Sequence, residues 1–494
     1  MAARSDTESA RGAADDRRWL ALGVLAMAQF MVFLDETVVN VALPSIKADL
    51  GFSQASLAWV VNAYMLAFGG LLLLGGRVAD LFGRRRIFLG GIALFGVASL
   101  LDGLAQSEGM LVGARWLQGV GAALATPAAL AVVTSLFPAG AERTKALAIW
   151  GALAGLGFAV GVLLSGVITD LASWRWVFLI NIPVALAALV AVPRIVPESR
   201  IAGRRQFDFA GAVTVTAGMT ALVYALLNTS DAGWRSSETH ALIAAALALL
   251  VGFAVIESRS AAPLIPANIV LRRATLVPNV LQFLLGSSLI SAFFLLTLYL
   301  QQVLGYTPLR AGLAYLPLAA GVAVATGVAD RLVGKVGPRP LATVGLGTAV
   351  PGLVIMGRAP LDGDYLTNVL PGLVLLGFGA GLSFVSITTA ALARVEHAIA
   401  GVASGMLNTA ALIGGSLGLA VLAGIASTRR TNQLDAGATP LAAQVSGLQL
   451  AFLIAAAVAL TGSLVAVFAL QRERVGGEDA AAATAVTTAG ESLS

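Results

Sequence analysis

The segment Val78-Ala79-Asp80-Leu81-Phe82-Gly83-Arg84 is echoed 250 residues further on by Val328-Ala329-Asp330-Arg331-Leu332-Val333-Gly334-Lys335. In each copy an acid is followed by a glycine and a base at the end of a long apolar run. A second echo pairs residues 117–124 with residues 375–382, in the same order along the chain. Repeats this far apart are typical of polytopic membrane proteins built from duplicated helix bundles. The sequence therefore predicts two related halves.

Apolar runs of membrane-spanning length surround both copies of this segment. Of the 494 residues, 58% are hydrophobic and 12% are charged, an apolar excess that one water-soluble core of this size could not bury. Runs of about 18 to 25 apolar residues, the length needed to cross a bilayer, indicate fourteen spans. Six spans belong to each half, and two lie between the halves. We therefore expect an all-α polytopic membrane protein with two six-helix bundles and two inserted helices.

The predicted domain organisation has five parts. Residues 1–18 are a polar tail, 19–193 the first bundle, 194–258 a linker with the two inserted helices, 259–471 the second bundle and 472–494 a second tail. The second tail is rich in Ala, Thr and Gly, so we expect it to be disordered. The first span lacks a small-residue cleavage site, which predicts a retained helix and not a signal peptide.

The Lys and Arg residues predict how the helices are oriented. If the first tail is cytoplasmic, the inner segments hold 23 of the 31 Lys and Arg residues, the outer loops hold 7, and Arg115 alone lies within a span. Basic residues prefer the cytoplasmic side, which predicts a cell (inner) membrane protein with both termini in the cytoplasm. Because these residues lie in short turns, the lipid bilayer is the expected partner and nucleic acid is not. The sequence leaves the oligomeric state open.

Three charged residues lie inside predicted spans at similar depth. Asp35 and Glu36 come about five or six residues before the outer end of the first span, and Arg115 lies about five residues inside the fourth. A lone charge there costs about 2.5–3.5 kcal/mol on insertion scales and normally faces a partner or a wet cavity. An acid balanced between desolvation and a nearby arginine is suited to bind and release a proton. A structural arginine bonded to backbone carbonyls is the alternative.

The two neighbouring acids of the first span point in different directions. At about 100° per residue Gln29, Glu36 and Asn40 form one polar stripe, and Asp35 lies about 100° away from it. Helix geometry alone therefore favours Glu36 over Asp35 as the acid that faces a partner.

The loop between the second and third spans combines an acid with a basic triplet. Positive-inside anchoring explains the arginines, but it explains neither the acid nor the second copy of the loop. We therefore expect a conformational latch that breaks and re-forms as the two halves rock. Its residues are Gly76, Asp80, Gly83, Arg84, Arg85 and Asp330.

Polar or aromatic residues inside otherwise apolar spans are the candidate substrate contacts. They are Gln29, Asn62, Tyr64, Thr126, Gln282 and Asn408. Each is equally compatible with a hydrogen bond between helices. No cysteine occurs and the two histidines are isolated, so we expect neither a metal site nor a cofactor. The stretch Asp330–Val336 lacks the first glycine and the Ser or Thr of a phosphate-binding loop, which disfavours a nucleotide-driven pump.

Five separated motifs resemble those of the major facilitator superfamily, in its fourteen-helix drug:proton antiporter branch. They are Leu34–Pro44 in the first span, the Gly76–Arg86 loop, Arg115–Gly121 in the fourth span, Tyr299–Gly312 and Gly401–Asn408. The resemblance covers nearly the whole chain outside the two tails. It implies a transporter and not an enzyme, one that exports small hydrophobic or amphiphilic, often cationic, drugs or natural products in exchange for protons by alternating access.

The resemblance also implies roles for single residues. In this branch the first-span acid and the fourth-span arginine serve proton coupling, a role carried here to Asp35 and Arg115, with Glu36 kept as a further candidate. One motif departs from the branch, because Val162 stands where a proline usually follows the glycine of the fifth span. Without this proline the fifth span is expected to bend less. The prediction that substrate and protons are obligatorily exchanged is weakened accordingly. Two alternatives stay open: a proton-independent metabolite facilitator or importer, and a non-transporting membrane receptor.

Overall fold

The computed structural model describes most of the chain. The described residues are 2–53, 56–138, 140–199, 208–233, 236–260, 263–264, 272–393 and 400–471, with the side chains of 2–16, 154, 230–232, 400 and 401 left aside. The predicted tail 472–494 and the arginine-rich part of the predicted linker, residues 200–207, lie outside them. In the described part every regular element is helical, and 14 helical segments are long and apolar enough to cross a membrane. The prediction of an all-α, fourteen-span protein is confirmed.

The first half contains six spans, and the inserted pair follows it. The helices are α1 (Ala2–Leu50), α2 (Trp59–Phe82), α3 (Arg84–Gly103), α4 (Glu108–Leu136), α5 (Ala141–Leu171), α6 (Trp176–Leu179), α7 (Asn181–Ile195), α8 (Phe209–Ala232) and α9 (Ser237–Arg259). The second half contains α11 (Arg273–Leu298), η2 (Tyr299–Val303), α12 (Pro308–Ala314), α13 (Leu316–Val336), α14 (Pro338–Met356), η3 (Tyr365–Val369), α15 (Leu370–Leu392), α16 (Ala400–Asp435) and α17 (Pro440–Ala469).

Two spans are divided into a pair of α-helices. The sixth span consists of α6 and α7, and the tenth consists of α12 and α13, which meet at Tyr315. Pro317 accounts for the second break, because its nitrogen carries no hydrogen for the α-helical ladder and its ring crowds the preceding turn. The apolar runs alone did not reveal either break, since hydropathy continues across both.

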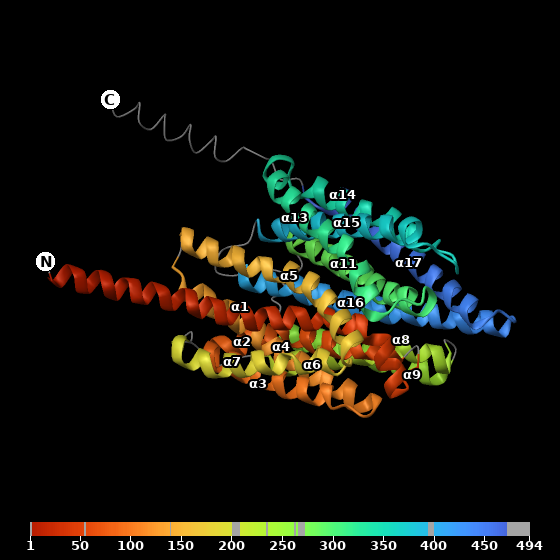
Figure 1. The fold of residues 1–494 in the computed structure, drawn as a ribbon, viewed down its shortest axis with the longest axis horizontal. Coiled ribbons are helices and arrows are strands. Elements are labelled where there is room, and N and C mark those ends of the chain that lie inside the picture. Colours follow the sequence, from red (N-terminus) through yellow and green to blue (C-terminus); the bar gives the residue numbers. More distant parts are fainter. Residues whose placement is uncertain are drawn as a thin grey trace.

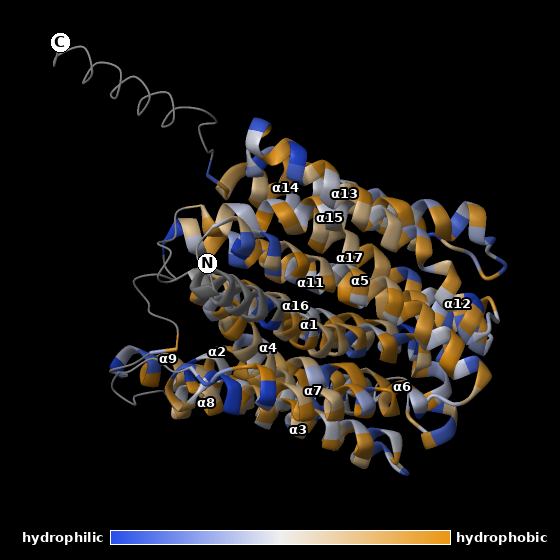
Figure 2. Ribbon diagram, turned by 60° about the vertical axis from the view of Figure 1, so that its left-hand side comes forward, coloured by the Kyte–Doolittle hydropathy of each residue, from blue (hydrophilic) through white to orange (hydrophobic). Residues whose placement is uncertain are grey.

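The two halves lie side by side with their helices along one common direction (Figure 1). In the first half α2, α3, α4 and α7 lie together, and α13, α14, α15 and α17 lie together on the opposite side, with α1, α5 and α16 between them. The inserted helix α8 packs against α2 and α16, and α9 packs on α8. Apolar residues cover most of the helix surfaces, and hydrophilic residues gather toward the helix ends (Figure 2). This is the surface that a lipid-embedded bundle requires.

The halves meet at two seams that depend on small residues. On the α2–α16 seam the Ser416 hydroxyl donates to the Asn62 side-chain oxygen at 3.0 Å. On the α5–α12 seam a Cβ added at Gly166 would lie 2.7 Å from the Pro308 carbonyl oxygen, so only glycine allows the backbones to come this close. Near the same end of the molecule the Gln301 side chain of η2 donates to the Val41 carbonyl of α1 at 2.7 Å. The two halves are therefore in contact at the end that the charge pattern assigns to the outside.

Candidate functional site

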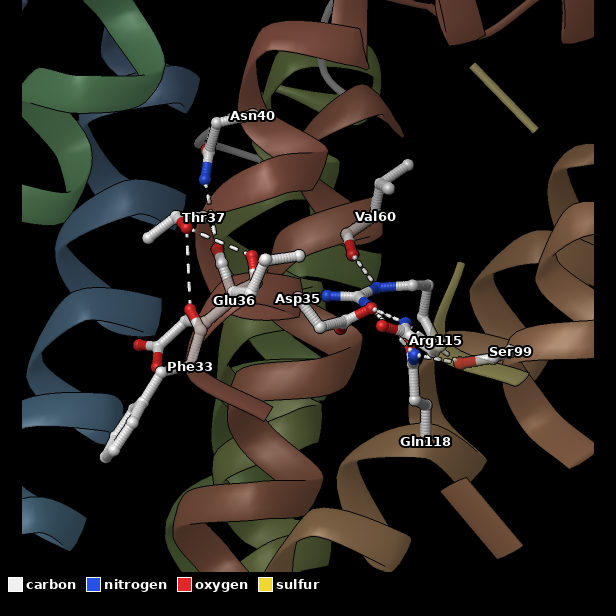
Figure 3. A network of polar contacts seen from close by, with 11 residues as sticks. Phe33, Asp35, Glu36, Thr37, Asn40, Val60, Ser99, Arg115 and Gln118 are labelled. Carbon is white, nitrogen blue, oxygen red and sulfur yellow. Dashed lines mark hydrogen bonds and ion pairs between the residues drawn. The ribbon is translucent and has the colours of Figure 1, made fainter. Parts of the chain in front are cut away.

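A buried ion pair joins α1 to α4 in the core of the first half. Arg115 Nη1 lies 2.6 Å from Asp35 Oδ2, and the two side chains are 1% and 0% exposed. Arg115 Nε also donates to the Val60 carbonyl of α2 at 3.0 Å. The sequence placed these two charges at one depth on separate helices, and the structure brings them together, as Figure 3 shows.

Three neutral side chains complete the network around the ion pair. Gln118, one turn along α4, accepts from Arg115 and donates to Asp35 Oδ1 at 2.8 Å and to the Ser99 hydroxyl of α3 at 2.7 Å. Asn181, the first residue of α7, donates to Asp35 Oδ1 at 2.8 Å. Both oxygens of the Asp35 carboxylate are therefore occupied by donors. These contacts tie four helices, α1, α3, α4 and α7, to one acid.

Aromatic rings close the arginine off from water. The guanidinium carbon of Arg115 lies 4.4 Å from the centre of the Tyr64 ring and 5.6 Å from that of the Phe178 ring. A cation over the face of an aromatic ring is stabilised by about 2 kcal/mol or more when desolvated. Removing one partner from a buried pair of this kind typically costs about 3–5 kcal/mol, because the other charge is left without compensation. The ion pair can therefore separate only if a proton neutralises Asp35, or if Arg115 gains another partner.

Glu36 lies outside this network. Its side chain is half-buried, and among the described residues its carboxylate makes no hydrogen bond or ion pair. Its backbone carbonyl accepts from the Asn40 side chain at 3.2 Å. The predicted stripe of Gln29, Glu36 and Asn40 therefore does not face Arg115, and the acid next to it in the sequence does.

The predicted latch residues of the first half form a compact ionic knot. Arg84 Nη2 lies 2.8 Å from Asp80 Oδ1, and Arg84 Nη1 donates to the Ala131 carbonyl of α4 at 3.3 Å. Arg85 donates its backbone N–H to Glu198 Oε1 at 3.1 Å and its guanidinium to the Val196 carbonyl at 3.0 Å. All these contacts stay within the first half and the segment that directly follows α7. Sequence reasoning missed Glu198, because it lies in the segment interpreted as a linker.

Of the remaining latch candidates, Gly83 lies against this knot, and Gly76 and Asp330 lie apart from it. Gly83 has a φ of 113°, and an added Cβ would meet Glu198 Oε1 at 2.8 Å, so the turn needs glycine. Gly76 packs on α4, where its Cβ would lie 3.4 Å from Cβ of Pro127. Asp330, in the second copy of the loop, is exposed and makes no ion pair with another described residue. The structure therefore brings the first copy together and leaves Asp330 alone.

Most of the candidate substrate contacts are buried polar groups with unused hydrogen-bonding capacity. The groups without a hydrogen-bond partner in the described part are Gln29 Nε2, Asn62 Nδ2, the Tyr64 hydroxyl, the Thr126 hydroxyl and Gln282 Oε1. Buried polar atoms of native proteins are normally paired with protein or water. Unpaired donors and acceptors on α1, α2, α4 and α11 are thus available to a ligand or to water. Asn408 differs from the others because it is exposed.

Sequence reasoning missed four residues of this region: Ser99, Gln118, Asn181 and Asp102. Gln118 lies within the Arg115–Gly121 motif, which gave a role only to its arginine. Ser99 and Asn181 carry no charge, and single Ser or Asn residues are common in membrane spans, so no spacing marks them. Asp102 did carry a signal, because it is an acid within the apolar run of the third span. It is 0% exposed in the structure, and neither carboxyl oxygen has a hydrogen-bond partner among the described residues.

Curated relatives of this chain are bacterial resistance and export proteins. The puromycin resistance protein pur8 of Streptomyces alboniger is 41% identical over 450 residues, which cover 90% of this chain and 89% of that protein. The cephamycin export protein CmcT of Amycolatopsis lactamdurans is 41% identical over 406 residues, covering 81% and 84% of the two chains. A probable actinorhodin transporter of Streptomyces coelicolor is 35% identical over 86% of this chain and 75% of its own.

Solved structures share the fold at lower sequence identity. A bacterial homolog of the human lysosomal transporter Spinster matches with a TM-score of 0.65 and 18% identity over 92% of this chain and 96% of that chain. The nucleoside transporter NupG matches with a TM-score of 0.64 and 11% identity over 92% and 99%. The sequence profile of the Major Facilitator Superfamily matches residues 25–419, which is most of the chain. With fourteen membrane-spanning segments in the described part and relatives of this kind, the chain belongs to the major facilitator superfamily and is a multi-pass membrane transporter, not an enzyme.

Proposed function

We propose that this protein exports small hydrophobic or amphiphilic organic compounds, often cationic, in exchange for protons. The observation that carries the proposal is the Asp35–Arg115 pair, fully buried and joined by hydrogen bonds to two neutral side chains, Gln118 and Asn181. Structural stability alone gives little reason to keep such a pair, because apolar residues of the same size are often as stable. The relatives named for puromycin resistance and cephamycin export support export of natural products as the direction and the substrate class.

Protonation of Asp35 is the proposed coupling step. A neutral carboxyl loses most of its attraction to Arg115 and turns one acceptor oxygen into a donor, which conflicts with the N–H donors of Gln118 and Asn181. The α1–α4–α7 contact then loosens, and the two halves rock to open the opposite side. Substrate binds when Asp35 is ionised and leaves when it is protonated. Because position 162 holds valine and not proline, the fifth span does not by itself enforce this exchange.

The ionic knot is the proposed latch on the cytoplasmic side. In the described residues it contacts α4 and the 193–199 segment and not the second half, while the halves touch at the other end through Gln301 and Val41. This arrangement fits a state that is closed at the outer end and released at the inner end. In the opposite state Asp80 and Arg84 would contact the second half, and Asp330 would gain a partner.

The proposed substrate contacts are the unpaired amides between the halves. Gln29 of α1, Asn62 of α2 and Gln282 of α11 each keep one amide atom without a partner. Such groups orient a ligand by hydrogen bonds, while its apolar body is bound by surrounding side chains. Tyr64, Thr126 and Asn408 are further candidates.

Orientation in the cell membrane, with both termini in the cytoplasm, is the proposed topology. Ser236, the N-cap of α9, lies in a loop assigned to the outside. The chain has no cysteine, so Ser236→Cys gives a single labelling site. We expect a membrane-impermeant maleimide to label it in intact cells, and a reporter active only in the cytoplasm to work when fused after Arg474. Labelling of Ser236→Cys only after the cells are lysed would reverse the topology.

The decisive experiment measures dye and proton flux in inverted vesicles energised by respiration. Ethidium, a lipophilic fluorescent cation, and puromycin serve as the two substrate probes. We expect both to accumulate inside and each addition to release protons from the vesicle lumen. Accumulation without proton movement would favour the facilitator alternative. Binding of the probes without any movement across the membrane would favour a receptor.

A further inference from the structure

Asp102 is a second acid in the core of the first half, and neither the ion pair nor the latch uses it. It lies in the last turn of α3 and is 0% exposed. Neither carboxyl oxygen has a hydrogen-bond partner among the described residues. An ionised carboxylate that is buried without a partner costs several kcal/mol even after the protein relaxes. The group avoids that cost by holding a proton.

The helix geometry places Asp102 level with Arg115. The helices α3 and α4 are antiparallel neighbours, and Ser99 on α3 is level with Gln118 on α4, since the two side chains hydrogen-bond at 2.7 Å. Three residues further toward the outer end, about 4.5 Å along each helix, lie Asp102 and Arg115. Residues three apart share a helix face, so Asp102 lies on the face of α3 that carries Ser99 to the network.

The charged surroundings of Asp102 consist of the network itself. Arg115 of α4 and Asp35 of α1 both act electrostatically on Asp102. Tyr64 of α2 lies against Arg115, and α7 contributes only the neutral Asn181 at this level. Glu36 of α1 also interacts electrostatically with Arg115 and Asp35. Arg115 is therefore a permanent cation with three acids near it, and in the described residues only Asp35 is paired with it.

A short route connects Asp102 to the outer end. Helix α3 ends one residue later at Gly103, and the Ala105 carbonyl accepts from Arg175 Nη2 at 3.1 Å. The Arg175 side chain is 34% exposed and pairs with Asp49 at the end of α1. Asp102 is thus one residue from the end of α3 and three residues along the chain from Ala105, whose carbonyl contacts a partly exposed cation.

We propose that Asp102 is a second proton-binding residue of the transport cycle, which holds the proton while Asp35 is paired with Arg115 and passes it to Asp35. This rests on the proposed function. In the transfer the O–H bond of Asp102 breaks as one forms on Asp35, and Arg115 changes its partner from Asp35 to Asp102. The three groups carry one positive and one negative charge before and after the step. Asp35 then releases the proton to the cytoplasm and returns to Arg115, and Asp102 takes a new proton from the outer side.

Infrared difference spectroscopy tests the proton on Asp102 without requiring transport. The full chain is purified into lipid in the Glu36→Gln background, which removes the other acid near the network. We expect the C=O band of a protonated buried carboxyl at neutral pH, and its loss in Asp102→Asn. The band should also be lost in Asp35→Asn, because Asp102 then ionises to pair with Arg115. An unchanged band in Asp102→Asn means that Asp102 is not protonated, and survival of the band in Asp35→Asn overturns the exchange of partners.

Transport assays separate a proton carrier from a structural residue. In inverted vesicles Asp102→Asn should lower uphill ethidium accumulation by about a hundredfold, the lower end of the range for losing a positioned proton-transfer group. Energy-independent exchange of ethidium across the same membrane should stay within about twofold of the parent, and Asp102→Glu should restore part of the uphill rate. Equal losses in both assays would overturn the proposal. If the parent protein itself moves ethidium without protons, the proposed function fails, and the infrared result still decides whether Asp102 is protonated.

Discussion

At the scale of single residues, the site depends on how completely the two oxygens of Asp35 are occupied. Oδ2 accepts from Arg115 at 2.6 Å, and Oδ1 accepts from Gln118 and Asn181, each at 2.8 Å. An ionised carboxylate only accepts hydrogen bonds, so this arrangement fits the charged form and not the neutral one. Binding one proton therefore changes several interactions at once, which is what a switch between two conformations requires.

Asp35→Asn should abolish uphill export while leaving substrate binding and downhill exchange measurable. The amide resembles the protonated acid, so the variant can complete the steps that need a neutral side chain but cannot release a proton. Glu36→Gln should keep uphill export, because in the described residues the Glu36 carboxylate makes no hydrogen bond or ion pair with the network. Accumulation of ethidium in inverted vesicles measures the first property, and ethidium exchange measures the second. If Glu36→Gln loses coupling and Asp35→Asn keeps it, the proton carrier is Glu36.

The sequence predicted the charged residues of the site better than its neutral ones. Asp35 and Arg115 are identifiable because a charge within an apolar span is costly and needs a partner. The helical stripe favoured Glu36, yet the arginine is on the other side of α1, a direction that one helix alone does not define. Ser99 and Asn181 could not be predicted as members, since their role follows from how α3 and α7 pack against α1. The way the helices pack therefore decides which neutral residues take part in the network.

At the scale of secondary-structure elements, the turn between α2 and α3 shows how a loop is fixed at a helix junction. Gly83 has a φ of 113° and serves as the C-cap of α2 and the N-cap of α3 at once. Its position is held by Arg84, whose backbone N–H donates to the Ser199 carbonyl at 2.9 Å, and by Glu198 packed against it. The repeat in the sequence revealed the turn, but the partner segment 193–199 lies more than a hundred residues away. Only the fold brings the two together.

Gly83→Ala should destabilise the protein. A Cβ at this φ is strained, a cost of about 1–3 kcal/mol, and it would also lie 2.8 Å from Glu198 Oε1. Gly90→Ala is the matched control, because Gly90 lies within α3 with no atom within 4 Å of an added Cβ. There alanine should be neutral or stabilising by up to about 1 kcal/mol, through its higher helix propensity. Thermal denaturation of the detergent-purified variants measures the stability of Gly83→Ala and of Gly90→Ala. Equal stability of these two variants would mean that the turn relaxes without strain.

At the scale of the whole molecule, the positions of the contacts between the halves define the conformational state. In the proposed orientation the outer end is closed through α5–α12 and through Gln301 on Val41. The ionic knot at the opposite end bonds to α4 and to the 193–199 segment, and in the described residues it makes no contact with the second half. The fourteen spans and the two related halves were predictable, because hydropathy and the internal repeat are properties of the sequence. The conformational state could not be predicted from the sequence, because alternating states share every span and differ only in which seam is closed.

Gly166→Leu should open the outer seam and slow export. An added Cβ at Gly166 would lie 2.7 Å from the Pro308 oxygen and 3.0 Å from Leu309 Cα, so the larger side chain excludes the closed state. Overpacking of this kind costs about 1–3 kcal/mol, which shifts the balance of states by about fivefold to a hundredfold. Gly151→Leu, on the same helix with no atom within 4 Å of an added Cβ, is the control.

Accessibility of Val162 reports the state of this seam directly. Val162 is 2% exposed, and in the cysteine-free chain Val162→Cys provides a single thiol beside Gly312. An impermeant maleimide added from the outside should label it slowly in the Gly151→Leu background and several-fold faster in the Gly166→Leu background, because only the second substitution separates α5 from α12. Ethidium export should fall in parallel with the gain in labelling. Slower export with unchanged labelling would show that Gly166 acts on another step of the cycle and not on closure of the outer end.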